Sequence, residues 1–384
     1  MDKRVYLLTI VSFVVGMVEL IIGGILDLVA TDLGVSLGKA GFLITIFSLV
    51  FAIAGPILLV MTAKIERKRL TLFFLLIFSL GNLIAVISPS YSILFIGRII
   101  SAASGSLLIV LCLTMATNIV AKRYRARAIG IVVMGVSGSI VLGLPIGLIL
   151  GNAFGWRAPF VMITILTLIS MTGVYFFMGK VAPKPAIPIG KQLATLKSRK
   201  IFFAQLTTFL FLAGHLTIYA YLTPFLKTTM GMTGTWISMA YLIFGVAAVA
   251  GGGIGGVLSD RIGPRKTIIS VIIVFGLILF AIPYSTFSVP VFLVILTIWG
   301  MLSWSITPAM QSYLIEASPE TSDIQQSLNN SALHFGIAFG SFLGGIAIEH
   351  ISVEHNATIG GMFLILALVA AAVSMAKSRE KVMA

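Results

Sequence analysis

The chain has 384 residues, of which 59% are hydrophobic and only 10% carry a charge. A chain of this composition cannot cover a core with a polar surface, so a soluble globular domain is excluded. The formal net charge of +14 would favour nucleic acid as a partner of a soluble protein, but here Lys and Arg gather in every second connection between apolar stretches. We interpret them as signals of membrane topology and expect no nucleic-acid partner.

Twelve apolar stretches follow one another along the chain, and each is long enough to cross a hydrocarbon core of about 30 Å as a helix. They lie at residues 5–30, 38–62, 70–88, 91–119, 128–151, 158–180, 201–227, 235–258, 266–284, 289–313, 325–348 and 358–376. The pattern predicts an all-α polytopic membrane protein whose solvent is the lipid bilayer.

The distribution of basic residues predicts the orientation of these helices. Lys3 and Arg4 precede the first stretch, a basic cluster around Lys68 follows the second, and another around Arg125 follows the fourth. The alternate connections are almost free of positive charge. Because basic loops stay on the cytoplasmic side, we expect both termini to be cytoplasmic.

The longest connection divides the chain into two similar parts. It contains several prolines and four basic residues, and it joins the sixth and seventh stretches. We predict an N-terminal six-helix half at 1–180, a basic cytoplasmic linker at 181–200 and a C-terminal six-helix half at 201–384. Repeated halves that surround a site near the bilayer midplane are typical of secondary transporters.

Several motifs connect the chain to a known family. The segment "GGVLSDRIGPRKTI" follows the eighth stretch, "FIGRIISAASG" places an Arg in the fourth, and "GLPIG" lies in the fifth. Together they resemble the major facilitator superfamily. The segments "AGHLTIYAYLTPFL" and "SWSITPAMQSYLIEASPETSDIQQSLNNSALHFGIAFGS" are more narrowly similar to the bacterial drug:proton antiporter family, above all to its purine base and nucleoside efflux members. The resemblance implies two pseudo-symmetric six-helix halves in the bacterial cytoplasmic membrane.

The sequence departs from the family pattern at three positions. In the first-half copy of the loop motif, Ala63 stands where Asp is expected and Glu66 where Gly is expected. The resemblance therefore implies that a charged cytoplasmic latch operates mainly from the second half. Asp27 replaces a Pro that is common in related exporters, so the usual bend of the first helix lacks its proline.

Ionisable residues at membrane depth are functional candidates because they are costly there. At a rise of about 1.5 Å per residue, Glu19 and His215 each lie roughly 21 Å from the inner end of their stretches, and Arg98 lies roughly 10 Å from the outer end of its own. We predict that these three residues couple transport to protons. Glu19 is expected to bind a proton under the influence of Arg98, although a permanent ion pair, a carbonyl-capping arginine and a packing histidine remain alternatives.

A second group of residues could bind a small heterocycle. On the eleventh helix Gln326, Asn330 and His334 recur every four residues and form one polar stripe. Flat aromatic side chains suited to stacking a heterocycle are those of Tyr219, Trp299 and Trp304. Hydrogen bonding between helices and ordinary packing are the alternative roles.

Gating is the role expected for a third group. The resemblance implies that Asp260, Arg261 and Arg265 close the cytoplasmic side through a carboxylate held on a helix N-terminus. In the fifth helix, Gly143 and Pro145 would allow bending or close packing. Asp27 lies near the outer edge of the first helix, where it could take part in gating.

These observations predict a proton-coupled efflux antiporter that works by alternating access on purine bases, nucleosides or similar heterocycles. Multidrug or sugar efflux by the same mechanism is the main alternative, and a membrane sensor without transport is another. We expect no enzymatic activity, because neither a nucleophile motif nor a metal-binding pair appears in the spans. We likewise expect no cofactor and no metal site. The expected partners are a small-molecule substrate, protons and lipid, and the expected state is a monomer.

Overall fold

The computed structural model describes residues 2–183 and 187–376, so residues 184–186 of the predicted linker and 377–384 of the predicted C-terminal half lie outside the described residues. Every regular element within the described ranges is helical. Twelve of the helical segments are long and apolar enough to cross a membrane. They are carried by α1 (Lys3–Gly24), α3 (Leu37–Met61), α4 (Arg67–Ile87), α5 (Tyr91–Asn118), α6 (Arg125–Gly138) with the π-helical turn η2 (Ser139–Gly143) and α7 (Leu144–Phe154), α8 (Ala158–Phe177), α10 (Arg199–Tyr219), α12 (Gly234–Ile262), α13 (Pro264–Ser285), α14 (Val289–Ala317), α15 (Ser322–His350) and α16 (His355–Met375).

The remaining elements are short. They are α2 (Leu26–Leu33), α9 (Ile189–Ala194) and α11 (Leu222–Met230), with the 3₁₀ turns η1 (Lys122–Tyr124), η3 (Thr195–Lys197) and η4 (Pro319–Thr321). The fold class predicted from the sequence is confirmed by this arrangement. Helices are the expected form, because a spanning segment must satisfy its backbone N–H and C=O groups within itself.

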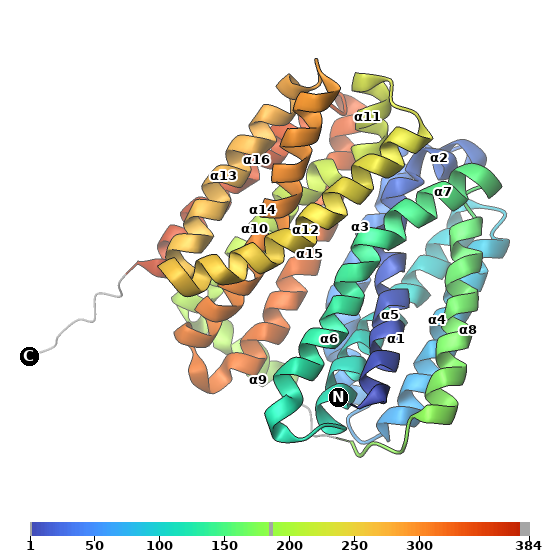
Figure 1. Cartoon of the computed structure of the whole chain (residues 1–384), viewed down its shortest axis with the longest axis vertical. Coiled ribbons are helices and arrows are strands. Elements are labelled where there is room, and N and C mark those ends of the chain that lie inside the picture. Colours follow the sequence, from blue (N-terminus) through green and yellow to red (C-terminus); the bar gives the residue numbers. More distant parts are fainter. Residues whose placement is uncertain (1, 184–186, 377–384) are drawn as a thin grey trace, which may run out of the picture.

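The helices form two bundles (Figure 1). In the first bundle α4 packs on α5 and α8, and α1 packs on α5 and α6. In the second, α12 packs on α14, and α10 packs on both α15 and α16. The bundles meet along two seams, where α3 packs against α15 and where η2 and α7 pack against α12. Residues at these seams are the ones whose neighbours change if one bundle moves against the other.

Two predicted spans are interrupted, which corrects the continuous helices expected at 5–30 and 201–227. The first helix stops at Gly24 and resumes at Leu26 as α2, because Ile25 leaves the helical conformation (φ −111°, ψ 19°). The seventh stops at Tyr219 and resumes at Leu222 as α11. The first helix therefore breaks without a proline, and it does so two residues before Asp27.

Candidate functional site

Glu19 and His334 meet where the two bundles adjoin. Glu19 belongs to α1, and its carboxylate Oε1 lies 2.9 Å from Nδ1 of His334 on α15. The side chain of Glu19 is 17% exposed and that of His334 is 7% exposed. Within the described chain neither atom has a well-aligned hydrogen-bond partner. The two groups are thus at ion-pair distance without hydrogen-bond alignment.

Arg98 completes this group from α5 and is almost fully buried, with 1% of its surface exposed. Its Nη1 donates to the carbonyl oxygen of Val18 at 2.7 Å, and its Nη2 donates to the carbonyl oxygen of Glu19 at 3.0 Å. Nε points to the carbonyl oxygen of Leu43 at 3.5 Å, and the guanidinium carbon lies 4.1 Å from the ring centre of Phe47. In this conformation the donors of Arg98 cap backbone carbonyls, while its charge stays beside the backbone of Glu19.

Residues of α3 hold His334 in place from the side. The ring of Phe51 lies 4.2 Å from the ring of His334, measured between centroids. One turn earlier on α15, the hydroxyl of Ser331 donates to the carbonyl oxygen of Ala52 at 3.2 Å. We call Glu19, Arg98 and His334 the interbundle cluster. It draws on α1, α5 and α15, and α3 fixes the position of its histidine.

His215 is not part of this cluster. Its Nδ1 accepts a hydrogen bond of 3.1 Å from Nε1 of Trp299. The rings of Tyr219, Phe244 and Phe275 surround it with centroid distances of 5.0 to 5.9 Å. The structure thus brings together three predicted residues, His215, Tyr219 and Trp299, inside the second bundle among α10, α12, α13 and α14. All three side chains are buried, and Nδ1 of His215 acts as an acceptor, which is the behaviour of a neutral packing histidine.

The predicted amide stripe on α15 divides by environment. Gln326 donates to the carbonyl oxygen of Gln311 at 3.3 Å, and Asn330 is exposed. His334 is taken up by the interbundle cluster. Trp304 of α14 is partly buried. Of the predicted substrate-binding residues, Asn330 is the one whose polar group remains most open to solvent.

A neighbouring amide group was missed by the sequence analysis. Asn329 donates to Oε1 of Gln205 at 2.9 Å and to the hydroxyl of Thr208 at 2.8 Å, and all three residues are buried. Nε2 of Gln205 in turn lies 3.2 Å from the carbonyl oxygen of Gln325. This network fastens α10 to α15. The i,i+4 spacing of Gln325 and Asn329 was visible, one residue away from the chosen stripe, but the spacing alone does not tell which stripe faces α10.

The ends of the bundles that carry α2 and α11 are held together by hydrogen bonds across the interface. The hydroxyl of Thr223 donates to the carbonyl oxygens of Gly23 at 3.0 Å and Gly24 at 3.2 Å, just before the break between α1 and α2. The hydroxyl of Tyr241 also points to the Gly23 carbonyl, at 3.3 Å. Donors of the second bundle therefore satisfy carbonyls that the helix break leaves without a continuing helix.

Charged and small residues extend the same closure. Asp27 of α2 pairs with Lys227 of α11, and Ser36 hydrogen-bonds to Glu349. Gly41 lies so close to Tyr221 that an added Cβ would collide with the phenolic oxygen. The bundles are thus closed at the α2 and α11 end, and Asp27 takes part in that closure through its ion pair.

At the opposite end, the predicted latch residues show no such closure among the described residues. Asp260 and Arg261 are exposed at the end of α12, and no ion pair joins either of them to the first bundle within the described chain. Arg265 lies with its guanidinium carbon 5.9 Å above the ring of Tyr313 in its own bundle. The predicted latch residues are therefore disengaged in this conformation.

Gly143 and Pro145 lie at an irregular turn of the fifth span. Gly143 ends the π-helical turn η2, and a Cβ there would lie 2.8 Å from Cγ of Met17 on α1. Pro145 occupies the first turn of α7. Both residues serve the close approach of this span to α1, and the π-helical turn marks where the span changes its winding.

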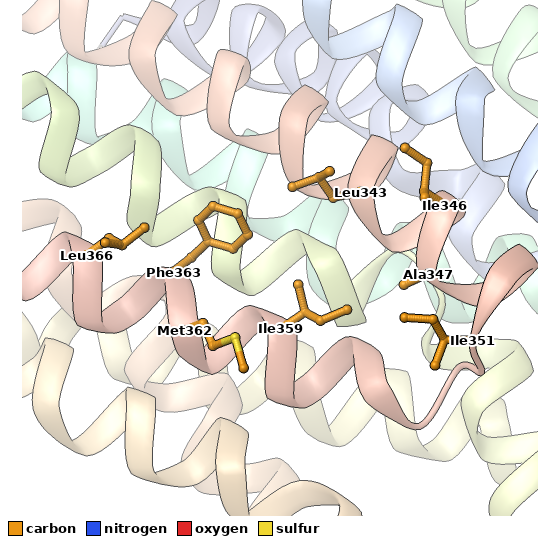
Figure 2. A pocket seen from close by; sticks show the side chains of 8 residues that line it. All are labelled: Leu343, Ile346, Ala347, Ile351, Ile359, Met362, Phe363 and Leu366. Atoms are coloured by element: carbon orange, nitrogen blue, oxygen red, sulfur yellow. The ribbon is translucent and has the colours of Figure 1, made fainter.

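A surface pocket between α15 and α16 has a different character. Figure 2 shows its lining, which consists only of hydrophobic side chains. They are Leu343, Ile346, Ala347, Ile351, Ile359, Met362, Phe363 and Leu366. Because it offers no hydrogen-bonding side chain, this pocket does not suit a polar heterocycle.

Comparison with known proteins agrees with the arrangement of two helical bundles around a polar interface. Residues 8–340 match the family model described as Major Facilitator Superfamily. The chain belongs to the major facilitator superfamily. Members of this superfamily are transporters of small molecules and not enzymes, so the chain is a multi-pass membrane transporter.

Several bacterial relatives cover nearly the whole chain. An MFS-type transporter of Bacillus subtilis, YbcL, is 36% identical over 96% of this chain and 94% of its own length. The inner membrane transport protein YdhP of Escherichia coli is 27% identical over 89% and 88%. A probable sugar efflux transporter of Mannheimia succiniciproducens is 25% identical over 94% and 90%.

Solved structures support the fold. The crystal structure of a bacterial homologue of the human lysosomal transporter Spinster, in an inward-facing and occupied conformation, aligns with a TM-score of 0.83. It covers 97% of this chain and 96% of that one at 15% sequence identity. At this identity the likeness concerns the fold alone.

Proposed function

We propose that this transporter is a proton-coupled antiporter that exports a small heterocycle, a purine base or nucleoside, by alternating access. The observation that carries the proposal is the position of Glu19. Its carboxylate lies between the bundles and is partly exposed, and the buried guanidinium of Arg98 donates to its backbone carbonyl. An acid whose neighbours change when the bundles move can bind a proton in one conformation and release it in the other.

The proposed orientation follows from the basic loops. With both termini on the cytoplasmic side of a bacterial cytoplasmic membrane, the closed α2 and α11 end faces outward. The conformation described here is then closed to the outside. In the alternate conformation, Asp260, Arg261 and Arg265 would engage and close the cytoplasmic side, as the loop motif implies.

Purine export rests on the polar groups near the interface. The amides of Gln326 and Asn330 can donate to and accept from the edge of a nucleobase. Sugar efflux is the second candidate, because relatives of 24–25% identity are described as probable sugar efflux transporters. An uncharged sugar would use the same amides. Purine export and sugar efflux therefore differ mainly in that a purine ring needs an aromatic surface on which to stack.

Transport into proteoliposomes with an imposed pH gradient tests the proposal. Radiolabelled hypoxanthine, guanine and adenosine are compared with a labelled hexose and a cationic dye. Purine accumulation that depends on the gradient supports the proposal. Accumulation of hexose or dye alone would move the substrate assignment to sugar or multidrug export, and saturable binding without flux would indicate a sensor.

The role of Glu19 is tested in the same vesicles. Glu19→Gln is expected to abolish accumulation driven by the pH gradient while exchange of labelled for unlabelled substrate continues, because the amide cannot carry the proton. The exposed Glu320 supplies a matched control, and Glu320→Gln should accumulate substrate as the parent does. Unchanged accumulation in Glu19→Gln would remove this residue from coupling.

A further inference from the structure

His334 is the residue through which the second bundle reaches Glu19. Its Nδ1 faces the carboxylate at 2.9 Å, and no other well-aligned partner is found for that nitrogen among the described residues. His215, by comparison, accepts a hydrogen bond at Nδ1 from the indole N–H of Trp299, as a buried packing histidine does. With Nδ1 at ion-pair distance from the carboxylate and no hydrogen-bond partner among the described residues, His334 is close enough to exchange a proton with Glu19.

We propose that His334 is a second proton-binding residue of the transporter, which receives the proton of Glu19 when the bundles close at the α2 and α11 end. This inference rests on the proposed proton coupling. In the transfer, the O–H bond of protonated Glu19 breaks and an N–H bond forms at Nδ1 of neutral His334. The products are a carboxylate and an imidazolium, and the total charge of the pair does not change.

The proton determines how firmly the two bundles hold together at this point. With the proton present, an imidazolium faces a carboxylate across the interface, and a charged pair is bound more strongly than a neutral ring and a carboxylate. When the proton leaves, the attraction weakens and the bundles separate more easily. Acid conditions should therefore favour the conformation described here. The side chains keep a small exposed fraction, 17% for Glu19 and 7% for His334.

The surroundings contain few other groups that could respond to pH. From α5, the adjacent charge is Arg98, which is held by backbone carbonyls. From α3, the ring of Phe51 and the carbonyl of Ala52 are the contacts. On α10, which packs against α15, His215 is turned into the aromatic group of the second bundle.

The other helices that pack against α15 carry ionisable groups with other partners or at exposed positions. On α14, the hydroxyl of Tyr313 donates a hydrogen bond to the carbonyl oxygen of Ser374, and Glu316 is exposed near the helix end. Lys191 of α9 is exposed as well, and α16 presents His355 at its exposed first turn. Glu19 and His334 are thus two titratable side chains that face each other across the bundles at this depth.

The test measures closure of the outer end as a function of pH. Spin labels are attached at Ser90→Cys, in the α4–α5 connection, and at Phe287→Cys, in the α13–α14 connection; both positions are exposed. The single native cysteine, Cys112, is buried. A short distance between the two labels represents the closed outer end, and a long distance represents the open one. Lowering the pH from about 8 to about 6 should raise the ratio of short to long distances about five-fold or more in the labelled protein without further substitutions.

Variants separate a proton-binding role from a structural one. His334→Gln should remove the pH response, whereas His350→Gln, the same change at an exposed position of α15, should keep it. The exchanged pair, Glu19→His with His334→Glu, should restore part of the response. If His334→Gln lowers the closed population equally at every pH and leaves the response intact, the inference is wrong.

The outcomes also distinguish this inference from the proposed function. If Glu19→Gln abolishes accumulation driven by the gradient and His334→Gln does not, proton coupling stands and the role of His334 fails. If neither variant alters flux but both abolish the pH response of the distances, the exchange between the two residues stands and proton-coupled transport fails.

Discussion

At the scale of single residues, Thr223 shows how one hydroxyl can join the two bundles. Its oxygen donates to carbonyls of Gly23 and Gly24 that lie at the end of α1. Thr223→Val keeps the shape and removes the donor. A hydrogen bond of this kind in a membrane protein contributes about 1 kcal/mol, so the closed population at the α2 and α11 end should fall by roughly five-fold.

Spin-label distances between Ser90→Cys and Phe287→Cys measure that change. Thr229→Val is the matched control, because Thr229 lies on the same helix and its hydroxyl donates to Phe225 within α11. An equal effect of the two substitutions would show that the loss of a helix-internal hydroxyl, and not of the contact across the interface, is responsible.

Residue types and depths could be predicted from the sequence, but partners could not. The similar depth of Glu19 and Arg98 follows from counting along each stretch, and the structure does place both at the bundle interface. Counting cannot give the rotation of a helix about its axis. For this reason the depth count groups His215 with Glu19, although its side chain lies in an aromatic group, and the polar stripe groups His334 with two amides, although its Nδ1 faces Glu19. The functional roles of both histidines stay predictions.

At the scale of elements, Glu66 ties the predicted linker to the first bundle. Its carboxylate caps α4 by accepting from the backbone N–H groups of Lys68 at 2.8 Å and Arg69 at 2.9 Å. It also accepts from the N–H of Val181 at 2.7 Å, and the N–H of Arg67 returns a bond to the Val181 carbonyl. The Glu that departs from the loop motif therefore has a specific contact, which the motif alone could not predict.

This contact should make stability depend on pH. Burial of Glu66 opposes its ionisation, but the N–H groups of Val181, Arg69 and Lys68 outweigh this effect and lower the pKa below its ordinary value of 4.5. A lowered pKa means that the stabilisation is complete above pH 4.5 and is lost as the pH falls through the shifted value.

Thermal unfolding in detergent measures the loss. Between about pH 6 and pH 3 the midpoint of Glu66→Gln should fall less than that of the parent, because the amide has no charge to lose. At neutral pH the variant should be the less stable protein. Glu320→Gln, a change at an exposed acid, should follow the parent throughout. A parallel fall in Glu66→Gln and the parent would contradict the prediction.

The positions of the helices can be predicted from the sequence, whereas the points at which two of them are interrupted cannot. The runs of apolar residues have the length of the bilayer, and the helices begin and end close to the predicted limits. The breaks at Ile25 and Tyr221 contain neither a proline nor a glycine in the left-handed conformation. The residue types that usually interrupt a helix are therefore not found at these breaks. The breaks are stabilised by contacts with the other bundle, and such contacts are absent from local sequence patterns.

At the scale of the whole molecule, the exposed position of Asp260 predicts that its substitution affects the two conformations of the transporter unequally. In the conformation described here the carboxylate is exposed and makes no ion pair with the described residues, so Asp260→Asn should not weaken this state. If Asp260 closes the opposite end in the alternate state, the substitution destabilises that state. The population should shift toward closure at the α2 and α11 end.

The shift can be followed with the same pair of spin labels, and a rise of about five-fold in the ratio of short to long distances is expected for a lost latch of about 1 kcal/mol. Asp323→Asn, at an exposed acid in the first turn of α15 of the same bundle, is the matched control and should leave the ratio unchanged. A shift toward the long distance in Asp260→Asn would show that this residue supports the present conformation instead.

The carbonyls of Gly23 and Gly24 also bear on how the protein is made. Thr223 lies 200 residues after Gly23 in the chain. During synthesis at about 5–20 residues per second, these carbonyls are made about 10–40 seconds before that hydroxyl. Throughout this interval two carbonyls in the membrane lack their donor. The carbonyls at the break of the first helix therefore receive their hydrogen bonds only from a late part of the chain. If the two halves are expressed as separate chains, the first should reach its final conformation only after it associates with the second.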